Sequence, residues 1–434
     1  MARRRLAAGG AQCGAWLDEG LRAALHQDGC RLLEQLFEDL ESTLEDNEAR
    51  PGEKCHPSRS KDLVTVLGKV SVSRAYFYRP ASEGEEKGRG RFPLDQALGL
   101  IDGYSCGMAK IMCRAGAMSS GYEAASADLK AYTGLEVEGR QIQRMVNLKA
   151  AEIQAHARSC APNQPPQAVS VFYASVDGTG VPMMGEELKG RPGKQEDGSS
   201  KTREVKLGCV FTQQSTDEEG HPLRDPGSTT YISSFQSAQD FGPLIRAEAI
   251  RRGMGLALMV VLLGDGAAWI WEIARTCFPF AVQIVDFFHA CEHLTVLAEL
   301  LFGKGTEQAK DQQYRWRGYL EADQVGAVIA EAKALCLSLG ANVKETGKAI
   351  GYFEHNENRM LYGTFRAAGY FIGSGVVEAG CKTVIGQRVK QSGMLWSVPG
   401  AGNVLDIRCA VMNGDFESYW NSAMPALVYL KEAA

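Results

Sequence analysis

Apolar residues recur at helical spacing through most of the first 160 residues, with one alternating stretch between them. Leucines at that spacing predict a helix or helix pair over residues 16 to 46. Residues 63 to 78 alternate apolar and polar positions around Gly68 and Lys69, which predicts a β-hairpin. Residues 94 to 158 are helical again. Their last two helices, joined at Thr133-Gly134, fit a helix-turn-helix or, equally well, an ordinary helical hairpin.

The pattern changes to alternating strands and helices after residue 168. Strands are predicted at residues 169–176, 203–213, 229–235, 256–263 and 281–285, and helices at 238–252 and 267–277. Three successive strands suit an antiparallel meander, and the later strands suit parallel additions. The fully apolar run at 256–263 favours an interior strand. This is an α/β pattern (α+β multidomain overall), with the strand order of a ribonuclease-H-like fold.

Composition shifts divide the chain into six predicted parts. They are an N-terminal helical region (1–60), the hairpin and a charged linker (61–93), the helix-turn-helix-like region (94–160), a first core segment (168–293), a helical segment (294–370) and a second core segment (371–434). The Pro-rich stretch 160–167 is the predicted main boundary. In the last segment, residues 374 to 390 read as a turn running into a helix.

Composition and charge narrow the possible functions. The chain has 434 residues, of which 45% are hydrophobic and 23% charged, a globular balance that suggests about two to four domains. The longest apolar run is too short for a bilayer, so no membrane partner is expected. Twelve cysteines with no C-x-x-C pair argue for a reducing cytosol and against a disulfide framework. With a net charge of −5, any nucleic-acid binding must use local basic patches.

Three carboxylates stand out by their position. Asp177 and Asp265 each follow an apolar strand and are flanked by glycine, and Glu378 lies in the first turn of the last predicted helix. Acids at adjacent strand ends converge at one sheet edge and repel unless a cation is present. Hard oxygen ligands favour two Mg²⁺ or Mn²⁺ ions, about 3.5–4 Å apart, for phosphoryl transfer. The alternatives are ordinary Asp-Gly turns and a helix-stabilising glutamate.

A histidine motif offers a second chemistry. Residues 289 to 293 spell H-x-x-E-H, the pattern of inverted zinc peptidases, with His289 and His293 on one helical face. Asp286 and His289 can be read as a helix cap and a core histidine, or as a polar pair beside the metals.

Several stretches resemble the DDE transposases of bacterial insertion sequences, in particular the ISKra group. They are SVDGTGVPM, LGDGAAWIW, QIVDFFHACEHL and GSGVVEAGCKTVIGQRVKQSGMLWS, and the resemblance extends from about residue 168 to 420. It implies that Asp177, Asp265 and Glu378 form the catalytic triad, with Asp177 contacting both metals. It also implies Asp286 and His289 as an accessory pair, and residues 294 to 370 as an all-helical insertion.

The resemblance implies DNA as the partner, both as terminal inverted repeats and as target, and a homo-oligomer on that DNA. The expected activity is metal-dependent end cleavage and strand transfer in a bacterial, nucleoid-associated cytoplasmic setting. A catalytically dead or co-opted DNA-binding copy is the alternative. The residues expected to contact DNA, each of which could instead be a plain surface side chain, are Arg140, Gln143, Arg144, Arg203, Lys206, Lys382, Arg388, Lys390 and Trp396.

The hairpin departs from the family pattern. Relatives carry a cysteine-paired zinc ribbon there, whereas only Cys55 and His56 precede this hairpin and Arg79-Pro80 follows it. The sequence therefore argues against a structural zinc.

Overall fold

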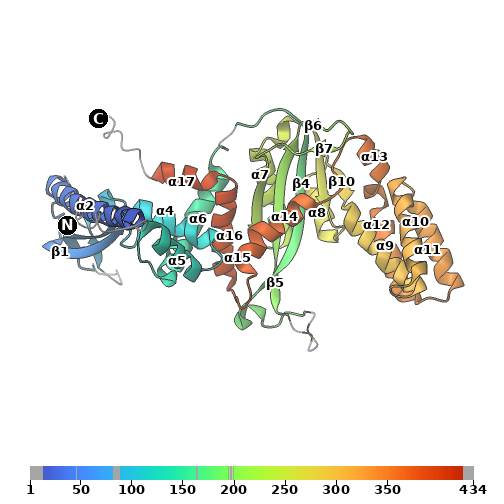
Figure 1. Cartoon of the computed structure of the whole chain (residues 1–434), viewed down its shortest axis with the longest axis horizontal. Helices are drawn as coiled ribbons and strands as arrows, with labels where there is room; N and C mark the ends of the chain where they lie inside the picture. Colours follow the sequence, from blue (N-terminus) through green and yellow to red (C-terminus); the bar gives the residue numbers. More distant parts are fainter. Residues whose placement is uncertain are drawn as a thin grey trace. The chain divides into compact units, whose positions relative to one another are not determined.

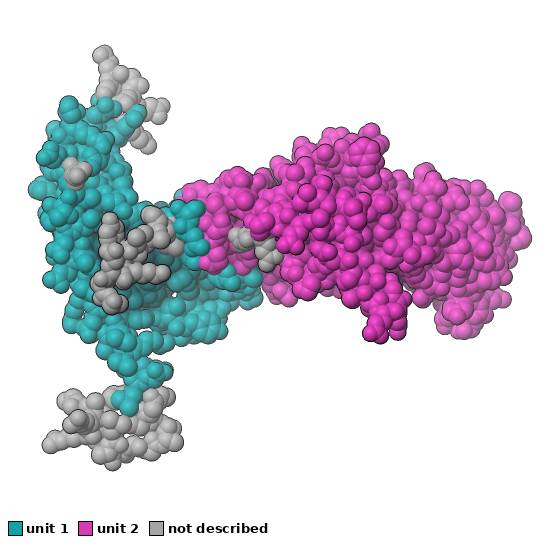
Figure 2. Space-filling model, turned by 90° about the horizontal axis from the view of Figure 1, so that it is seen from above, with its two compact units in different colours: residues 1–148, 420–434 teal, residues 149–419 magenta. Residues whose placement is uncertain are grey.

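A computed structural model describes residues 13–44, 46–81, 88–162, 165–193, 195, 198 and 200–423. The chain forms two compact units, residues 1–148 with 420–434, and residues 149–419 (Figure 2). The division lies within helix α6 (Gly139–Ser159), rather than in the predicted Pro-rich boundary at 160–167. The reason is local, because the last turns of α6 bond to the second unit: the Tyr419 hydroxyl donates to Glu152, and His156 bonds to Ser418.

In the first unit, helix α2 (Cys13–Thr43) packs on a hairpin of β1 (Lys54–Thr65) and β2 (Gly68–Arg79). The predicted leucine stripe of α2 divides into two sets. Leu33, Phe37, Leu40 and Leu44 pack against the buried core of this unit. Leu21, Leu25, Leu32 and Leu36 are exposed. The hairpin is present as predicted, but β1 begins at Lys54 rather than at residue 63. Its first part is exposed on both faces and therefore shows no apolar alternation.

The rest of the first unit is helical, as the sequence predicts. Its remaining elements are β3 (Arg89–Arg91), α3 (Pro93–Ala97), α4 (Cys106–Met118) and α5 (Tyr122–Thr133). Gly134 ends α5 with a φ of +75°, a conformation that glycine adopts without strain. Both predicted helices are present, and the start of α6 buries Ile142, Met145 and Val146, of which Ile142 and Val146 lie against Gly116 of α4.

The second unit is built on a five-stranded sheet with the order β10-β9-β4-β5-β8 (Figure 1). Its strands are β4 (Val169–Pro182), β5 (Thr202–Gln213), β8 (Thr230–Ser234), β9 (Ala257–Gly264) and β10 (Val282–Val285). The strands β4, β5 and β8 are antiparallel neighbours, whereas β9 is parallel to both β4 and β10. The predicted meander, parallel additions and interior position of β9 are confirmed, and the fold is mixed α/β. A short hairpin of β6 (Ser215–Thr216) and β7 (Pro222–Leu223) was not predicted.

Helices cover both faces of this sheet. On one face, Gly208 lies against Phe241 and Ile245 of α7 (Ala238–Arg251), and α7 packs on α8 (Ala268–Cys277). On the other face, Gly380 lies against Leu207 and Tyr231. This second cover consists of α14 (Gly375–Gly380), the π-helical segment η4 (Cys381–Gly386), α15 (Gln387–Val389) and α16 (Val398–Met412).

Between β10 and α14, the chain is helical throughout. The elements are α9 (Phe287–Phe302), α10 (Glu307–Glu321), α11 (Val325–Ser338), α12 (Val343–Asn356), η3 (Glu357–Arg359) and α13 (Tyr362–Ala367). They share buried apolar side chains such as Leu294, Trp316 and Val328. The unit also contains η1 (Gly185–Leu188), η2 (Met254–Leu256) and the start of α17 (Asp415–Ala423). No helix among the described residues has the length and apolar character needed to cross a membrane.

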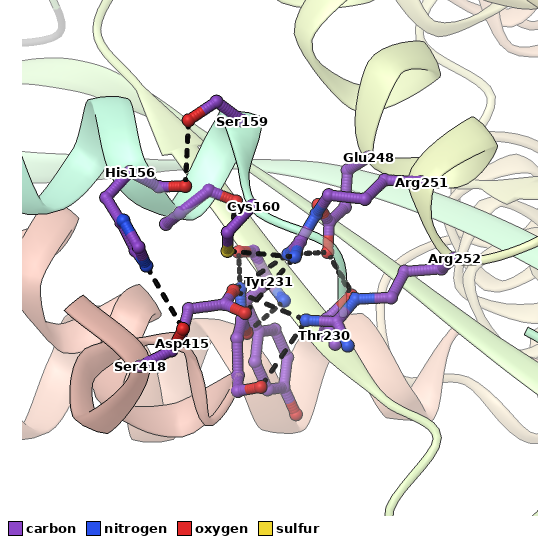
Figure 3. Close-up of polar contacts among 12 residues, drawn as sticks. His156, Ser159, Cys160, Thr230, Tyr231, Glu248, Arg251, Arg252, Asp415 and Ser418 are labelled. Atoms are coloured by element: carbon purple, nitrogen blue, oxygen red, sulfur yellow. Dashed lines mark hydrogen bonds and ion pairs between the residues drawn. The ribbon is translucent and has the colours of Figure 1, made fainter. Parts of the chain in front are cut away.

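A buried ion network fastens α7 to α17 (Figure 3). Arg251 pairs with both Glu248 and Asp415 at 2.7 Å, and Arg252 pairs with the same two carboxylates at 2.9 and 3.3 Å. The Thr230 hydroxyl donates to Glu248, which links the network to the edge strand β8. Because these charges are buried, their mutual pairing is what makes the arrangement tolerable.

Candidate active site

Two of the predicted catalytic acids lie side by side in the second unit. In the parallel ladder of β4 and β9, Ser175 pairs with Leu263. Asp177 lies two residues past that last pair, within β4, and Asp265 lies two residues past it, directly after the end of β9. The charge of Asp265 raises the pKa of Asp177, so the two carboxylates lie near each other. Their role as a catalytic pair stays a prediction.

Asp177 is not at the end of its strand, and that part of the prediction is wrong. Strand β4 continues to Pro182, and Asp177 pairs with Leu207 of β5. The ladder between β4 and β9, however, extends only to Ser175. Asp177 therefore lies just past the β9 ladder, while its other side remains part of the sheet. A side chain held within a long strand is more rigidly placed than one in a turn.

The third acid reaches the same region from the helical cover. The thiol of Cys381 donates to Oδ2 of Asp177 at 3.3 Å, which places the α14–η4 junction over this part of β4. Glu378 lies one turn earlier, in α14. Its Oε1 accepts a hydrogen bond from the Ser374 hydroxyl at 2.8 Å. The predicted buried stripe of this helix holds for Val377, Val384 and Ile385, whereas Cys381 turns to the aspartate instead.

Asp286 ties the start of α14 to the sheet. Its carboxylate is 1% exposed and accepts the backbone N–H of Ser374. It also accepts the backbone N–H of His289 at 2.6 Å, so it caps α9. Asp286 thus holds the backbone of Ser374, and the Ser374 hydroxyl in turn donates to Glu378. Asp286 therefore positions the glutamate through the serine.

The His289 side chain does not take part in that contact. Its Nδ1 lies 3.2 Å from Glu292, and its ring is edge-on to His293 at 4.9 Å. Of the two alternatives for Asp286 and His289, the structure shows the helix cap. The ring of His293 stacks on Tyr352, with centroids 3.6 Å apart. The H-x-x-E-H side chains thus contact one another and an aromatic ring.

The electrostatics of the three acids reflect their closeness. Burial raises the pKa of Asp177, the hydrogen bonds from Cys381 and Gly178 oppose that effect, and the charges of Asp265 and Glu378 raise it further. In the part of the chain that the structure describes, none of the three acids takes part in an ion pair. Like charges held together in this way favour a bound cation.

The donor chemistry of the three acids fits Mg²⁺ or Mn²⁺, because all three offer carboxylate oxygens. Asp265 uses one oxygen to accept from the backbone of Ala267 at 2.8 Å, and Asp177 one to accept from Gly178 at 2.6 Å. Within the described ranges, no three His, Cys, Asp or Glu side chains are close enough together to hold a metal as they stand.

Tyr352 of α12 is a site residue that the sequence analysis missed. Its hydroxyl donates to the backbone carbonyl of Asp265 at 3.0 Å. Its ring covers Gly266, where an added Cβ would lie 2.7 Å from a ring atom and where φ is +99°. The glycine beside Asp265 was a signal for close approach of another group. Nothing in the sequence indicated that the group would come from a tyrosine 87 residues later.

Three residues predicted to contact DNA are buried. Arg388 is 0% exposed and its guanidinium lies 5.1 Å from the ring of Trp396, whose Nε1 donates to the Val389 carbonyl. Lys206 is 8% exposed and pairs with Glu204 at 2.8 Å. Because these side chains are enclosed by protein, they do not present a charge or ring to DNA, and the prediction is corrected for all three.

The other predicted DNA contacts remain accessible. Lys382 is exposed beside the acids, and Lys390 is exposed with its Nζ 2.9 Å from Thr179 Oγ1. Arg203 is half-buried and pairs with Glu187 at 3.3 Å. In the first unit, Arg140, Gln143 and Arg144 are all exposed on α6, and Arg144 pairs with Asp102 at 2.8 Å.

A large cleft opens next to Gly266, between α8 and α12. Its volume is about 1040 Å³, and its lining is rich in cationic side chains: Arg275, Lys344, Lys348 and Arg359. Two carboxylates, Glu272 and Glu354, are also part of the lining. The cleft is therefore a positively charged surface that begins at the Asp265 loop.

The second unit is thus a mixed α/β domain with an acidic cluster on one face of its sheet.

No family model matches the chain. Over 411 residues the chain is 24% identical to the UPF0236 protein in the vanSb 3′ region of Streptococcus gallolyticus, a match covering 92% of this chain and 83% of that protein. Among solved structures, the Drosophila P element transposase strand transfer complex aligns with 73% of this chain and 80% of that chain, at 10% identity and a TM-score of 0.25.

Proposed function

We propose that this chain is a DDE-type transposase with a ribonuclease-H-like catalytic domain. It would hydrolyse a phosphodiester at the end of an insertion sequence and join the freed 3′-hydroxyl to target DNA. The observation that carries the proposal is the placement of Asp177 and Asp265, each two residues past the last pair of the parallel ladder between β4 and β9. The strand order of the sheet and the helices on both its faces agree with the proposed fold.

The three carboxylates have the roles of metal ligands. When bound by Asp177, Asp265 and Glu378, Mg²⁺ or Mn²⁺ supplies Lewis acidity to the attacking and leaving oxygens of an in-line phosphoryl transfer. The protein's part is to hold the acids in place. Ser374 orients Glu378 by a hydrogen bond, and Tyr352 fixes the loop that bears Asp265.

Exposed cations near the acids would bind the phosphate backbone. Lys382 lies on the helical segment that carries Glu378, Lys390 directly follows that segment, and the basic cleft begins beside Asp265. Contacts between single lysines and phosphates depend on the local charge, so a protein with a net charge of −5 can still make them. Each phosphate neutralised releases counterions, and the affinity for DNA should therefore fall steeply as salt rises.

The test is strand cleavage of labelled DNA that carries the element's own ends, in the presence of Mg²⁺. The variant is Glu378→Gln, which keeps the size of the side chain and an oxygen for the Ser374 hydrogen bond but removes the charge. The matched control is Glu292→Gln, an exposed acid of the H-x-x-E-H motif. We expect cleavage by the wild type and the control, and none by Glu378→Gln.

The other outcomes separate the alternatives. DNA binding without cleavage by any of the three proteins would make the chain a co-opted DNA-binding protein. Cleavage by Glu378→Gln at the wild-type rate would refute the assignment of the triad. Tightly bound zinc in the wild type that is lost in His293→Ala would favour the peptidase chemistry of the histidine motif.

A further inference from the structure

A pocket of about 740 Å³ opens between the β6–β7 turn, the start of α9 and residues 370–376. Its lining includes Arg366 and the aromatic residues Phe288, Tyr370 and Phe371. Phe288 is 65% exposed, although its neighbour Phe287 is 1% exposed and belongs to the core. Since Phe287 already serves the core at this point of α9, the Phe288 ring is left facing the pocket, where it can contact a ligand.

The pocket is connected to the candidate active site by the backbone. An added Cβ on Gly373 would lie 3.2 Å from the Phe288 ring, so the ring lies directly on residue 373. The next residue is Ser374, whose hydroxyl donates to Glu378. Gly375 also lines the pocket, and an added Cβ there would meet open space. A ligand in the pocket would thus touch the segment that begins α14.

The wall of the pocket is held firmly. The backbone N–H of Phe287 donates to the Ile372 carbonyl at 2.9 Å, and that of Ser374 donates to Asp286. The N–H of Phe371 donates to the buried Tyr173 hydroxyl at 3.2 Å. A preformed wall costs little ordering on binding, which favours a specific ligand over a casual contact.

The chemistry of the lining suits a flat, polar-edged ring attached to an anion. The side chain of Arg366 is 47% exposed and lies 3.8 Å from Glu321. His221 is 67% exposed and lies 3.1 Å from Asp217 and 3.5 Å from Glu219, the acid in the lining. Aromatic faces stack on nucleobases regardless of sequence, and a guanidinium adds attraction to a ring or a phosphate. Base contacts of this kind require a base that has left the duplex.

Resting on the proposed function, we propose that this pocket binds one unpaired nucleobase of the DNA strand whose phosphodiester lies at the three acids. Phe288 stacks on the base and Arg366 binds its edge or the adjacent phosphate. The pocket thereby fixes the strand end relative to Glu378. It would favour frayed or single-stranded ends over intact duplex.

The experiment compares two probes with the full-length protein. One is a short blunt DNA duplex, and the other is the same duplex with a single-stranded 3′ extension that contains 2-aminopurine. We expect the wild type to bind the extended duplex about tenfold more tightly and to quench the 2-aminopurine by stacking. Phe288→Ala should lose both the preference and the quenching but bind the blunt duplex normally.

Two further variants keep the test specific. Phe288→Tyr retains the aromatic face and should restore the preference. Phe280→Ala removes a phenylalanine that is 94% exposed and outside the pocket, and it should behave as the wild type does. Two results would refute the proposed base-binding pocket. One is equal affinity of the wild type for both probes, and the other is an equal loss of affinity for both probes in Phe288→Ala. Cleavage of element ends alongside either result would leave the proposed function standing, whereas no binding to either DNA would overturn both.

Discussion

Two groups of charged side chains in the second unit differ in burial and in electrostatics: Glu248 and Asp415 of the ion network are buried, whereas Asp177 and Asp265 are half-buried and Glu378 is exposed. In the network of Arg251, Arg252, Glu248 and Asp415, each carboxylate has guanidinium partners (Figure 3). Burial alone would raise the pKa of Glu248, but hydrogen bonds and attraction from the arginines outweigh it, and the pKa is lowered. At the three acids the pKa of Asp177 is raised.

The difference shows that cationic partners can outweigh burial, as at Glu248, and that without them burial raises the pKa of an acid, as at Asp177. A fully paired network needs nothing further and holds helices together. A group of acids without a cationic partner among the described residues costs stability, because like charges repel in a partly desolvated site. Such an arrangement is expected where a ligand supplies the opposite charge.

The largest expected effect is on activity. Asp177→Asn should reduce Mg²⁺-dependent cleavage by at least about 1000-fold, because a metal ligand is lost. The same change should leave the free energy of unfolding unchanged or slightly higher, since it removes one of three like charges. Single-turnover cleavage and denaturant unfolding, measured without divalent ions, check the two halves. A large loss of stability would mean that Asp177 is structural.

The opposite result is expected in the paired network. Asp415→Ala should lower the free energy of unfolding by about 3–5 kcal/mol, because Arg251 and Arg252 each lose a buried partner. Denaturant unfolding measures the change. The matched control is Glu307→Ala, which breaks an exposed pair with Lys310 and should cost less than about 1 kcal/mol. If the free energy of unfolding falls by less than about 1 kcal/mol in both variants, the network does not fasten α7 to α17.

An acid beside the network gives a pH-dependent effect. Burial raises the pKa of Asp406 to about 7, while Arg158 and Gln154 partly oppose it. The folded protein therefore binds this proton more tightly than the unfolded chain does, so the contribution of Asp406 to stability falls as pH rises from about 4 to 7. Asp406→Asn should remove this dependence, a difference of about 4 kcal/mol. Unfolding curves at several pH values, wild type against variant, measure it. Parallel pH profiles would contradict the shifted pKa.

The sequence predicted the sheet better than the exact position of the acids. Continuous apolar runs identify the strands, so the meander and the interior β9 could be read directly. The end of β4 could not, because residues 178 to 182 contain two glycines and read as a turn. In the structure they remain paired to β5. The prediction therefore placed Asp177 at the end of β4, whereas in the structure Asp177 lies within the strand.

Long-range partners account for the other misses. Arg388 reads as a surface cation, yet packing against Trp396 encloses it, and spacing along a helix does not reveal such a partner. The buried end of β1 was found by its alternation, whereas its exposed start was not. The contact of Tyr352 with Asp265 joins residues from separate elements, and only the folded chain brings them together.

The smallest expected effect concerns that contact and separates positioning from ligation. Tyr352→Phe keeps the ring over Gly266 and against His293 but removes the hydroxyl that donates to the Asp265 carbonyl. The loss of one hydrogen bond should cost about 1 kcal/mol of stability and reduce the cleavage rate by about tenfold or less. Tyr352→Ala should lower both stability and cleavage rate further, because the ring contacts are lost as well.

If Tyr352→Phe instead abolished cleavage as Asp177→Asn does, the hydroxyl would have a role at the reacting atoms. A Mg²⁺ titration of the cleavage rate distinguishes the cases: a misplaced Asp265 loop raises the Mg²⁺ concentration needed for half-maximal rate, and excess Mg²⁺ then restores much of the activity.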